Sequence, residues 1–241
     1  MKKPLYIFMH LAKTGGTTFV GHLYEHIGFN TGYFDQGPHG NHYRQHNSLP
    51  EIPDLSQAEK DGISVIGGHL VYWGVHEHFP KRDIRYITFI REPVSRVISH
   101  YTFDSSGKDV SFEEWYKTWI PNQMCVFYFD HLKVNTPEDI LKRLESFWHI
   151  AFTSELDYSL EYILKEMNLP LGYKNRRVAG EKENSTKDLG YSIYHPIREK
   201  YIPTQDEIKL ITEDHQQDIS LYEHLRKYVV NGKYIPSEQN E

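Results

Sequence analysis

Residues 10–18, His-Leu-Ala-Lys-Thr-Gly-Gly-Thr-Thr, bring a cation, two adjacent glycines and several hydroxyl side chains into one short stretch. A glycine-containing loop between a strand and a helix presents free backbone N–H groups and the helix dipole to one point, which suits a bound anion. Gly15 and Gly16 let the backbone approach that anion closely. Lys13 precedes the glycines, whereas the lysine of a Walker A loop follows them. The pattern indicates an anion-binding loop; a plain helix start with a threonine cap and a surface lysine is the alternative.

A second candidate for anion binding reads Arg-Glu-Pro-Val-Ser-Arg-Val-Ile-Ser-His-Tyr over residues 91–101. Arg91 directly follows an apolar stretch and would lie at the carboxyl end of a strand, where ligands bind in open α/β sheets. Its guanidinium keeps its charge and offers a planar set of donors for phosphate. Ser99 follows about two helical turns later. Taken alone, the segment is more typical of a structural helix start, with Ser95 and Arg96 capping or pairing locally.

Elements that could position these groups are visible in the hydrophobic pattern. Short apolar segments rich in Ile, Val or aromatic residues predict buried strands at 5–10, 63–67 and 85–90. Strands that alternate with helical patterns predict an α/β fold with a central parallel β-sheet flanked by helices. Apolar spacing predicts helices at 17–27, 93–101, 137–148, 157–168 and 205–228. The stretches 32–62 and 172–190 are predicted to be long loops.

Composition restricts the class of protein. The chain has 241 residues, 39% of them hydrophobic and 14% aromatic, so a folded core is expected, and residues 1–241 are predicted to form one domain. A net charge of −6 argues against general binding of nucleic acid. Cys125 is the only cysteine, which excludes an internal disulfide and a cysteine-based zinc site. No apolar run is long enough for membrane insertion and no signal peptide is evident, so a cytoplasmic location is expected.

The two motifs together resemble the nucleotide-binding sites of sulfotransferases that use 3′-phosphoadenosine 5′-phosphosulfate (PAPS). More closely, the chain is similar to the carbohydrate group that includes uronosyl (heparan) 2-O-sulfotransferases and their bacterial relatives. Three further stretches agree in order: Gly68-His69-Leu70, residues 150–160 and residues 218–222. The resemblance implies the P-loop-like sulfotransferase fold, a bacterial source, and transfer of a sulfuryl group from PAPS to a hydroxyl of a sugar or glycan.

The resemblance also implies roles for the anion-binding residues. Lys13 would lie near the oxygen that becomes the leaving phosphate, and Arg91 with Ser99 would bind the 3′-phosphate. The 5′-phosphosulfate would be held by the loop residues Lys13, Thr14, Gly15, Gly16, Thr17 and Thr18. No metal is implied, because cationic side chains and backbone N–H groups meet the negative charge.

A base must remove the proton of the attacking hydroxyl, and the resemblance favours His69 for this role. An imidazole with an ordinary pKa near 6.5 suits that step at neutral pH. The uronosyl group often has two histidines here, as H-x-H, but Gly67 occupies the earlier position in this chain. His10, just before the loop, is a second candidate. Asp35 and Glu92 are carboxylate alternatives.

Acceptor-binding residues are harder to select. Candidates with ring or cationic side chains are His10, His39, Arg44, Tyr72, Arg176 and Arg177. The basic segment 174–187 could form a flap over the 3′-phosphate or an anionic acceptor, or could be a solvated loop. His39, His42 and His46, like His76 and His78, lack the carboxylate or cysteine partners that would complete a metal site.

Two other classes of protein remain open from the sequence. A P-loop kinase would need Gly-Lys-[Ser/Thr] and a magnesium-binding aspartate at a strand end. A non-catalytic carbohydrate-binding protein would keep the fold and bind ligand without turnover. The resemblance to sulfotransferases, whose members can self-associate, implies a homo-oligomer.

Overall fold

The computed structural model describes residues 2–27, 32–34, 49–105, 108–170 and 201–236. Its centre is a five-stranded sheet in the order β2-β3-β1-β4-β5. The strands are β1 Pro4–Met9, β2 Gly32–Phe34, β3 Val65–Gly68, β4 Asp83–Ile90 and β5 His149–Phe152. All neighbouring pairs are parallel. The predicted α/β fold with a central parallel sheet flanked by helices is therefore confirmed.

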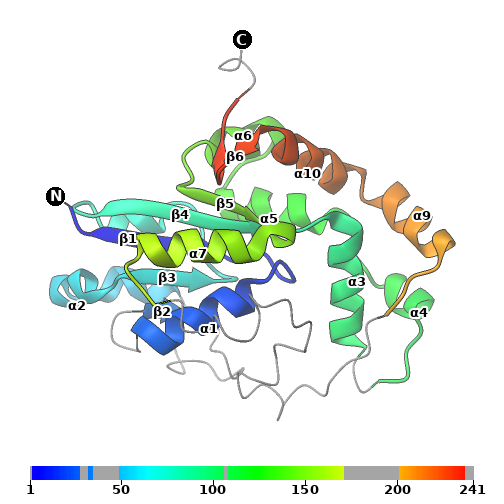
Figure 1. Ribbon diagram of the computed structural model, residues 1–241, viewed down its shortest axis with the longest axis horizontal. Coiled ribbons are helices and arrows are strands. Elements are labelled where there is room, and N and C mark those ends of the chain that lie inside the picture. The colour runs from blue at the N-terminus through cyan, green and yellow to red at the C-terminus, as the bar shows by residue number, and fades with distance from the viewer. Residues whose placement is uncertain (1, 28–31, 35–48, 106–107, 171–200, 237–241) are drawn as a thin grey trace.

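Strand order decides where a ligand can bind. The chain passes from β1 to β2 and β3 on one side of the sheet, whereas β4 and β5 lie on the other side. The order therefore reverses at β1, and the carboxyl end of such a switch point is where open α/β sheets bind ligands. In Figure 1 the carboxyl ends of these strands point toward α3 (Pro93–Asp104).

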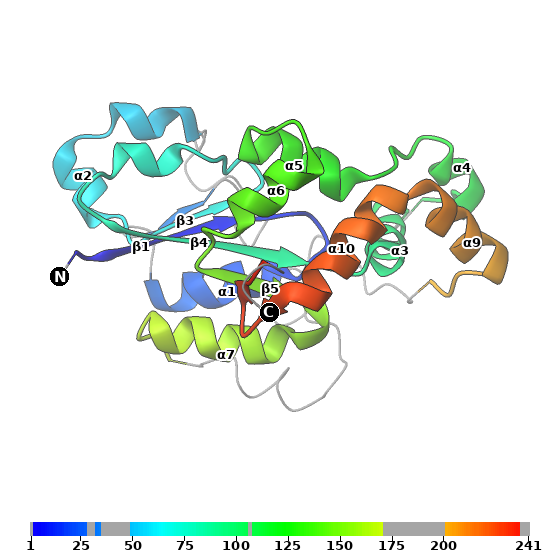
Figure 2. The same ribbon diagram turned by 90° about the horizontal axis from the view of Figure 1, so that it is seen from above.

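Helices cover both faces of the sheet (Figure 2). One face carries α1 (Gly16–Ile27) and α7 (Leu156–Glu166), and the other carries α5 (Gln123–Leu132) and α6 (Pro137–Leu144). Alternate residues of β1 supply the two cores, because successive side chains of a strand point to opposite faces. Leu5, Ile7 and Met9 belong to one buried cluster, and Tyr6 and Phe8 to the other.

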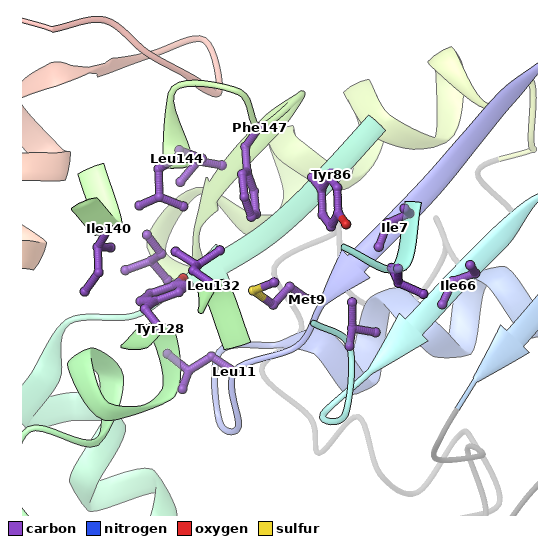
Figure 3. Packing of buried hydrophobic residues seen from close by; sticks show 14 of the residues in the cluster. Ile7, Met9, Leu11, Ile66, Tyr86, Tyr128, Leu132, Ile140, Leu144 and Phe147 are labelled. Carbon is purple, nitrogen blue, oxygen red and sulfur yellow. The ribbon is translucent and has the colours of Figure 1, made fainter. Parts of the chain in front are cut away.

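The larger core lies between the sheet and helices α5 and α6 (Figure 3). Met9 of β1 lies between the sheet residues Ile7 and Tyr86 on one side and the α5 residues Tyr128 and Leu132 on the other. This packing holds the end of β1, and therefore the loop that follows it, in a rigid setting.

The remaining elements are short or lie near the C-terminus. Short elements are η1 Leu49–Asp54, α2 Gln57–Gly62, η2 Val75–His78, α4 Phe112–Tyr116 and η3 Thr153–Glu155. Near the C-terminus lie α9 Gln205–Asp214, α10 Gln216–Tyr228, β6 Val229–Val230 and β7 Lys233–Tyr234. A third apolar cluster joins α3, α4 and α9, including Val97, Trp115 and Ile211. Among the described residues, no helix is long and apolar enough to cross a membrane.

Several sequence predictions need correction. The stretch 32–62 is not only loop, because it contains β2, η1 and α2; α2 is short and has no buried residue, so it lacks an apolar periodicity. The helix predicted over 205–228 is two helices that meet at His215. The helix predicted over 137–148 ends at Leu144, and its last residues lead into β5. Neither α5 nor β5 was predicted, since short apolar runs do not distinguish a strand from a buried helix.

Candidate functional site

The loop between β1 and α1 turns tightly at the carboxyl end of the strand. Lys13 has φ 68° and Gly15 has φ 94°, so the chain reverses tightly before α1 begins at Gly16. The Thr14 hydroxyl is buried and donates to the Leu11 carbonyl oxygen at 2.7 Å, and the Thr18 N–H donates to the Gly15 carbonyl at 3.0 Å. Thr17 is exposed at the start of the helix. This strand–loop–helix unit has the form that presents N–H groups to an anion.

Two side chains from other strands tie the loop to the sheet. Arg91, just after β4, donates from Nη1 to the Lys13 carbonyl oxygen at 3.2 Å. Thr153, just after β5, has its Oγ1 2.8 Å from the Thr14 carbonyl oxygen and 3.1 Å from that of Ile90. The structure thus brings Lys13 and Arg91 to one point at the carboxyl edge. Sequence analysis missed Thr153, because a lone threonine after a strand carries no signal.

Glu92 caps the start of helix α3. Its two carboxylate oxygens accept the N–H groups of Val94 at 2.8 Å and of Ser95 at 2.7 Å, and Pro93 takes the first helical position. These bonds assign Glu92 to capping and argue against its role as a base. They also fix the direction of α3, on which Ser99 lies partly buried.

His69 and His10 lie side by side because β1 and β3 are paired in register. Met9 is opposite Gly68, and the His10 N–H donates to the Gly68 carbonyl at 3.0 Å. Gly68 has φ 143°, a conformation that favours glycine, and the chain turns there. The His69 ring then stacks on the His10 ring with centroids 4.1 Å apart and planes at 21°.

A hydrogen bond determines which nitrogen of His69 can accept a proton. Nδ1 of His69 lies 2.7 Å from the backbone oxygen of His10. A carbonyl oxygen only accepts, so Nδ1 carries the hydrogen and the neutral ring has its free lone pair on Nε2. Burial lowers the pKa of His69; the bond to His10 opposes this shift, and His131 and Lys13 lower the pKa further. His69 is therefore a neutral imidazole at physiological pH.

A buried ion pair lies beneath the start of α3. Arg96 and Asp218 are 1% and 0% exposed, and Nη2 lies 3.6 Å from Oδ2, beyond hydrogen-bond distance. The Asp218 carboxylate also accepts the N–H groups of Met124 at 3.0 Å and Cys125 at 2.8 Å. Burial lowers the pKa of Arg96, and Asp218 opposes that shift. The pair joins α3, α5 and α10 immediately behind the Arg91 segment. The predicted local pairing of Arg96 is wrong, because its partner comes from α10.

Two groups near Lys13 had no predicted role. The Lys13 ammonium lies 4.0 Å from the centroid of the Phe103 ring, which is 41% exposed on α3. Burial lowers the pKa of His100 to about 4; Asp104 opposes the shift, and Arg96, Lys13 and His69 add to it. The α3 face toward the loop therefore carries an aromatic ring and a neutral imidazole.

A family comparison agrees with this geometry. The model of the sulfotransferase family matches residues 3–224, which is most of the chain. The chain belongs to the sulfotransferase family. Its fold is the sulfotransferase fold predicted from the sequence, and the family assignment supports a transferase that moves sulfuryl groups. A search of the curated proteins found no match.

Other predicted acceptor residues of this sulfotransferase lie in different settings. Tyr72 is half-buried and packs against the larger core. The predicted residues that lie outside the described residues are Asp35, His39, His42, Arg44, His46, Arg176, Arg177 and the segment 174–187. His76 bonds through Nδ1 to the Tyr86 hydroxyl at 2.9 Å.

Proposed function

We propose that this sulfotransferase transfers a sulfuryl group from PAPS to a hydroxyl of a sugar or glycan, with His69 as the general base. One observation carries the proposal. Three neighbouring strands place the Lys13 loop, Arg91 and a neutral His69 at the same edge of the sheet, where the strand order reverses. This set matches the needs of the reaction: anion binding, a cation for the leaving group and a base.

The residues of this edge fit the two charged ends of PAPS. The loop residues Lys13, Thr14, Gly15, Gly16, Thr17 and Thr18 would surround the 5′-phosphosulfate with N–H and hydroxyl donors. Arg91 donates one hydrogen bond to the Lys13 carbonyl. Its other N–H groups would bind the 3′-phosphate together with Ser99 on the next helix. When bound, PAPS supplies the sulfuryl group.

The chain's own groups would then divide the chemical work. His69 Nε2 would take the proton of the acceptor hydroxyl, because Nδ1 is held by the His10 carbonyl. Lys13 would stabilise negative charge on the departing phosphate oxygen, as preorganised cations do in phosphoryl transfer. Its ammonium would leave the Phe103 ring to do so.

Several other expectations stay predictions. They are a role for a second histidine, the single domain over 1–241, the homo-oligomer, the cytoplasmic location and the bacterial source. The acceptor contacts also stay predictions, for Tyr72, His39, Arg44, Arg176 and Arg177.

A transfer assay tests the proposal directly. Purified protein with sulfur-labelled PAPS and a panel of glycans and small alcohols should yield labelled product, and product analysis should identify the acceptor hydroxyl. Binding of adenosine 3′,5′-bisphosphate and of a glycan without any transfer would favour a non-catalytic carbohydrate-binding protein. Transfer of phosphate from ATP would favour a kinase.

Arg91→Ala should weaken binding of adenosine 3′,5′-bisphosphate by about 1.5–3 kcal/mol, the contribution of a hydrogen bond to a charged group. Isothermal titration calorimetry measures this change. Adenosine 5′-phosphate, which lacks the 3′-phosphate, should lose much less affinity in the same variant. Arg143→Ala on α6, where the guanidinium lies over Trp73, is the control and should bind normally. An unchanged bisphosphate affinity in Arg91→Ala would refute the 3′-phosphate assignment.

The acidic limb of the pH profile of kcat/KM should lie below pH 6.5. His69 acts as a base only while Nε2 is unprotonated, so activity falls as the pH drops through the pKa of His69. Burial lowers that pKa from its ordinary 6.5, against the opposing hydrogen bond to His10, and His131 and Lys13 add to the shift. Rates measured across pH at constant ionic strength check this. A limb above pH 6.5 would contradict the assignment.

A further inference from the structure

His10 makes an unusual set of contacts for a residue at the end of a strand. Its ring is buried, 7% exposed, and lies between two other rings: Phe8 on one side at 5.1 Å and 22°, and His69 on the other at 4.1 Å and 21°. Phe8 is itself 0% exposed and packs against Phe19 and Phe89. Among the residues that the structure describes, the three rings form a column that runs from the core to His69.

The same ring also lies close to Gly16, at the end of the loop between β1 and α1, which is called the phosphate loop below. A Cβ atom added to Gly16 would lie 2.1 Å from His10 Nε2 and 2.2 Å from its Cδ2. Only glycine leaves room for this approach at the first residue of α1. The His10 backbone meanwhile accepts the Nδ1 hydrogen of His69 at 2.7 Å. One residue therefore contacts both the loop and the base through its side chain, and holds the base through its carbonyl as well.

Burial argues against the other roles that His10 could have. A ring that is 7% exposed, with a ring stacked on each face, offers little surface to an acceptor or to a hydroxyl proton. His69, by contrast, is only partly buried and ends the column. The geometry therefore separates the two histidines into one that can meet the acceptor and one that supports it.

We propose that His10 is a positioning residue, which holds the ring of His69 and the start of the phosphate loop in a single arrangement so that the base faces the bound sulfuryl group. This inference rests on the proposed function. Misplacing a reacting group by about 1 Å can lower a rate about 100-fold, so a rigid support of this kind affects turnover without touching substrate.

The surroundings of the two rings favour an uncharged His10 side chain. Burial lowers the pKa of His10 well below 6.5, and His69 and Lys13 add to the shift. The groups that act on His69 are the His10 carbonyl, Lys13 of the loop and His131 of α5, and His69 in turn acts on His100 of α3. A neutral His10 adds no charge that would disfavour protonation of His69 during the reaction.

The test compares His10→Ala with His10→Gln, because the glutamine amide keeps a flat group with a terminal nitrogen near Gly16 and does not titrate. NMR of labelled histidine gives the tautomer and pKa of His69 in each protein, and kinetics give kcat and KM. We expect His10→Ala to lower kcat roughly 10- to 100-fold, with little change in acceptor KM, and to raise the pKa of His69 toward 6.5 as water enters. His10→Gln should recover much of the rate and retain the Nδ1-protonated tautomer.

Three results would overturn the inference. One is a normal kcat in His10→Ala. Another is a lower kcat with an unchanged His69 titration in both variants, which is the mark of a general structural role. A third is a selective rise in acceptor KM, which would make His10 an acceptor-binding residue. The His69 titration is independent of turnover: an inactive wild-type protein would refute the proposed function, while the titration would still decide whether His10 positions that ring.

Discussion

His69→Ala should lower turnover by on the order of 10²–10⁴, the usual contribution of a general base, while the affinity for adenosine 3′,5′-bisphosphate stays within about twofold, a small change on the affinity scale. The variant removes the imidazole whose Nδ1 is held by the His10 carbonyl, so that Nε2 is the nitrogen that can accept a proton, whereas His10 is enclosed by Phe8, His69 and Gly16. The nucleotide contacts proposed for Lys13 and Arg91 do not involve His69. Steady-state kinetics with PAPS and calorimetry with the bisphosphate separate the two effects.

The matched control for this experiment is His78→Ala, at the end of η2, which makes the same change outside the described edge. It should retain normal turnover. The acidic limb of the pH profile should disappear in His69→Ala and remain in the control. An active His69→Ala variant with its acidic limb intact would assign the base to another group, and equal losses in both variants would indicate a general effect on folding.

Asp218→Asn should destabilise the protein by about 3–5 kcal/mol, the usual result of removing one partner of a buried ion pair. Arg96 is 1% exposed, and its Nε and Nη2 have no hydrogen-bond partner in the part of the chain that the structure describes. Loss of the carboxylate charge leaves that guanidinium buried without compensation. It also weakens the bonds to the N–H groups of Met124 and Cys125, which begin α5. Urea unfolding followed by circular dichroism measures the change.

Glu223→Gln on the exposed side of α10 is the control, since it neutralises a carboxylate of the same helix; its effect should stay within about 0.5 kcal/mol. Adding Arg96→Met to Asp218→Asn should restore part of the stability, because the unpaired charge is removed. A loss below about 1 kcal/mol in Asp218→Asn, which is typical of an exposed ion pair, would show that the pair does not hold α3, α5 and α10 together.

The reciprocal capping of α5 and α10 explains why this region was hard to predict. Asp218 of α10 caps the start of α5, and Asn122 before α5 accepts the N–H groups of Gln217 and Asp218 at 3.0 and 3.1 Å. Each cap lies more than ninety positions away in the sequence. Start signals used in sequence analysis are local, within a few residues of the helix. A cap supplied by a distant helix leaves no such pattern, and α5 was therefore missed.

The loop after β1 and the start of α3 were predicted well because their signals are local. Glycines directly after an apolar strand and Pro93 at the first position of α3 each act within one turn of the chain, so the places of Lys13 and Arg91 at two strand ends could be predicted without knowledge of the fold. Glu92 shows the limit of this reasoning. Its residue type allowed a base or a cap, and only the bonds to Val94 and Ser95 distinguish the two.

By itself, the sequence of this sulfotransferase determined the parallel α/β fold, the loop after β1 and the arginine after β4. The reason is that hydrophobic periodicity, glycine and proline each influence the backbone within a few residues of the chain. Tertiary structure alone decided that Thr153, 139 positions from Thr14, ties the loop to the sheet. It also decided that the rings of His10 and His69, 59 positions apart, stack on each other and that Nδ1 of His69 bonds the His10 backbone. The physical reason is strand register: pairing Met9 with Gly68 sets which side chains meet, and register depends on the whole sheet.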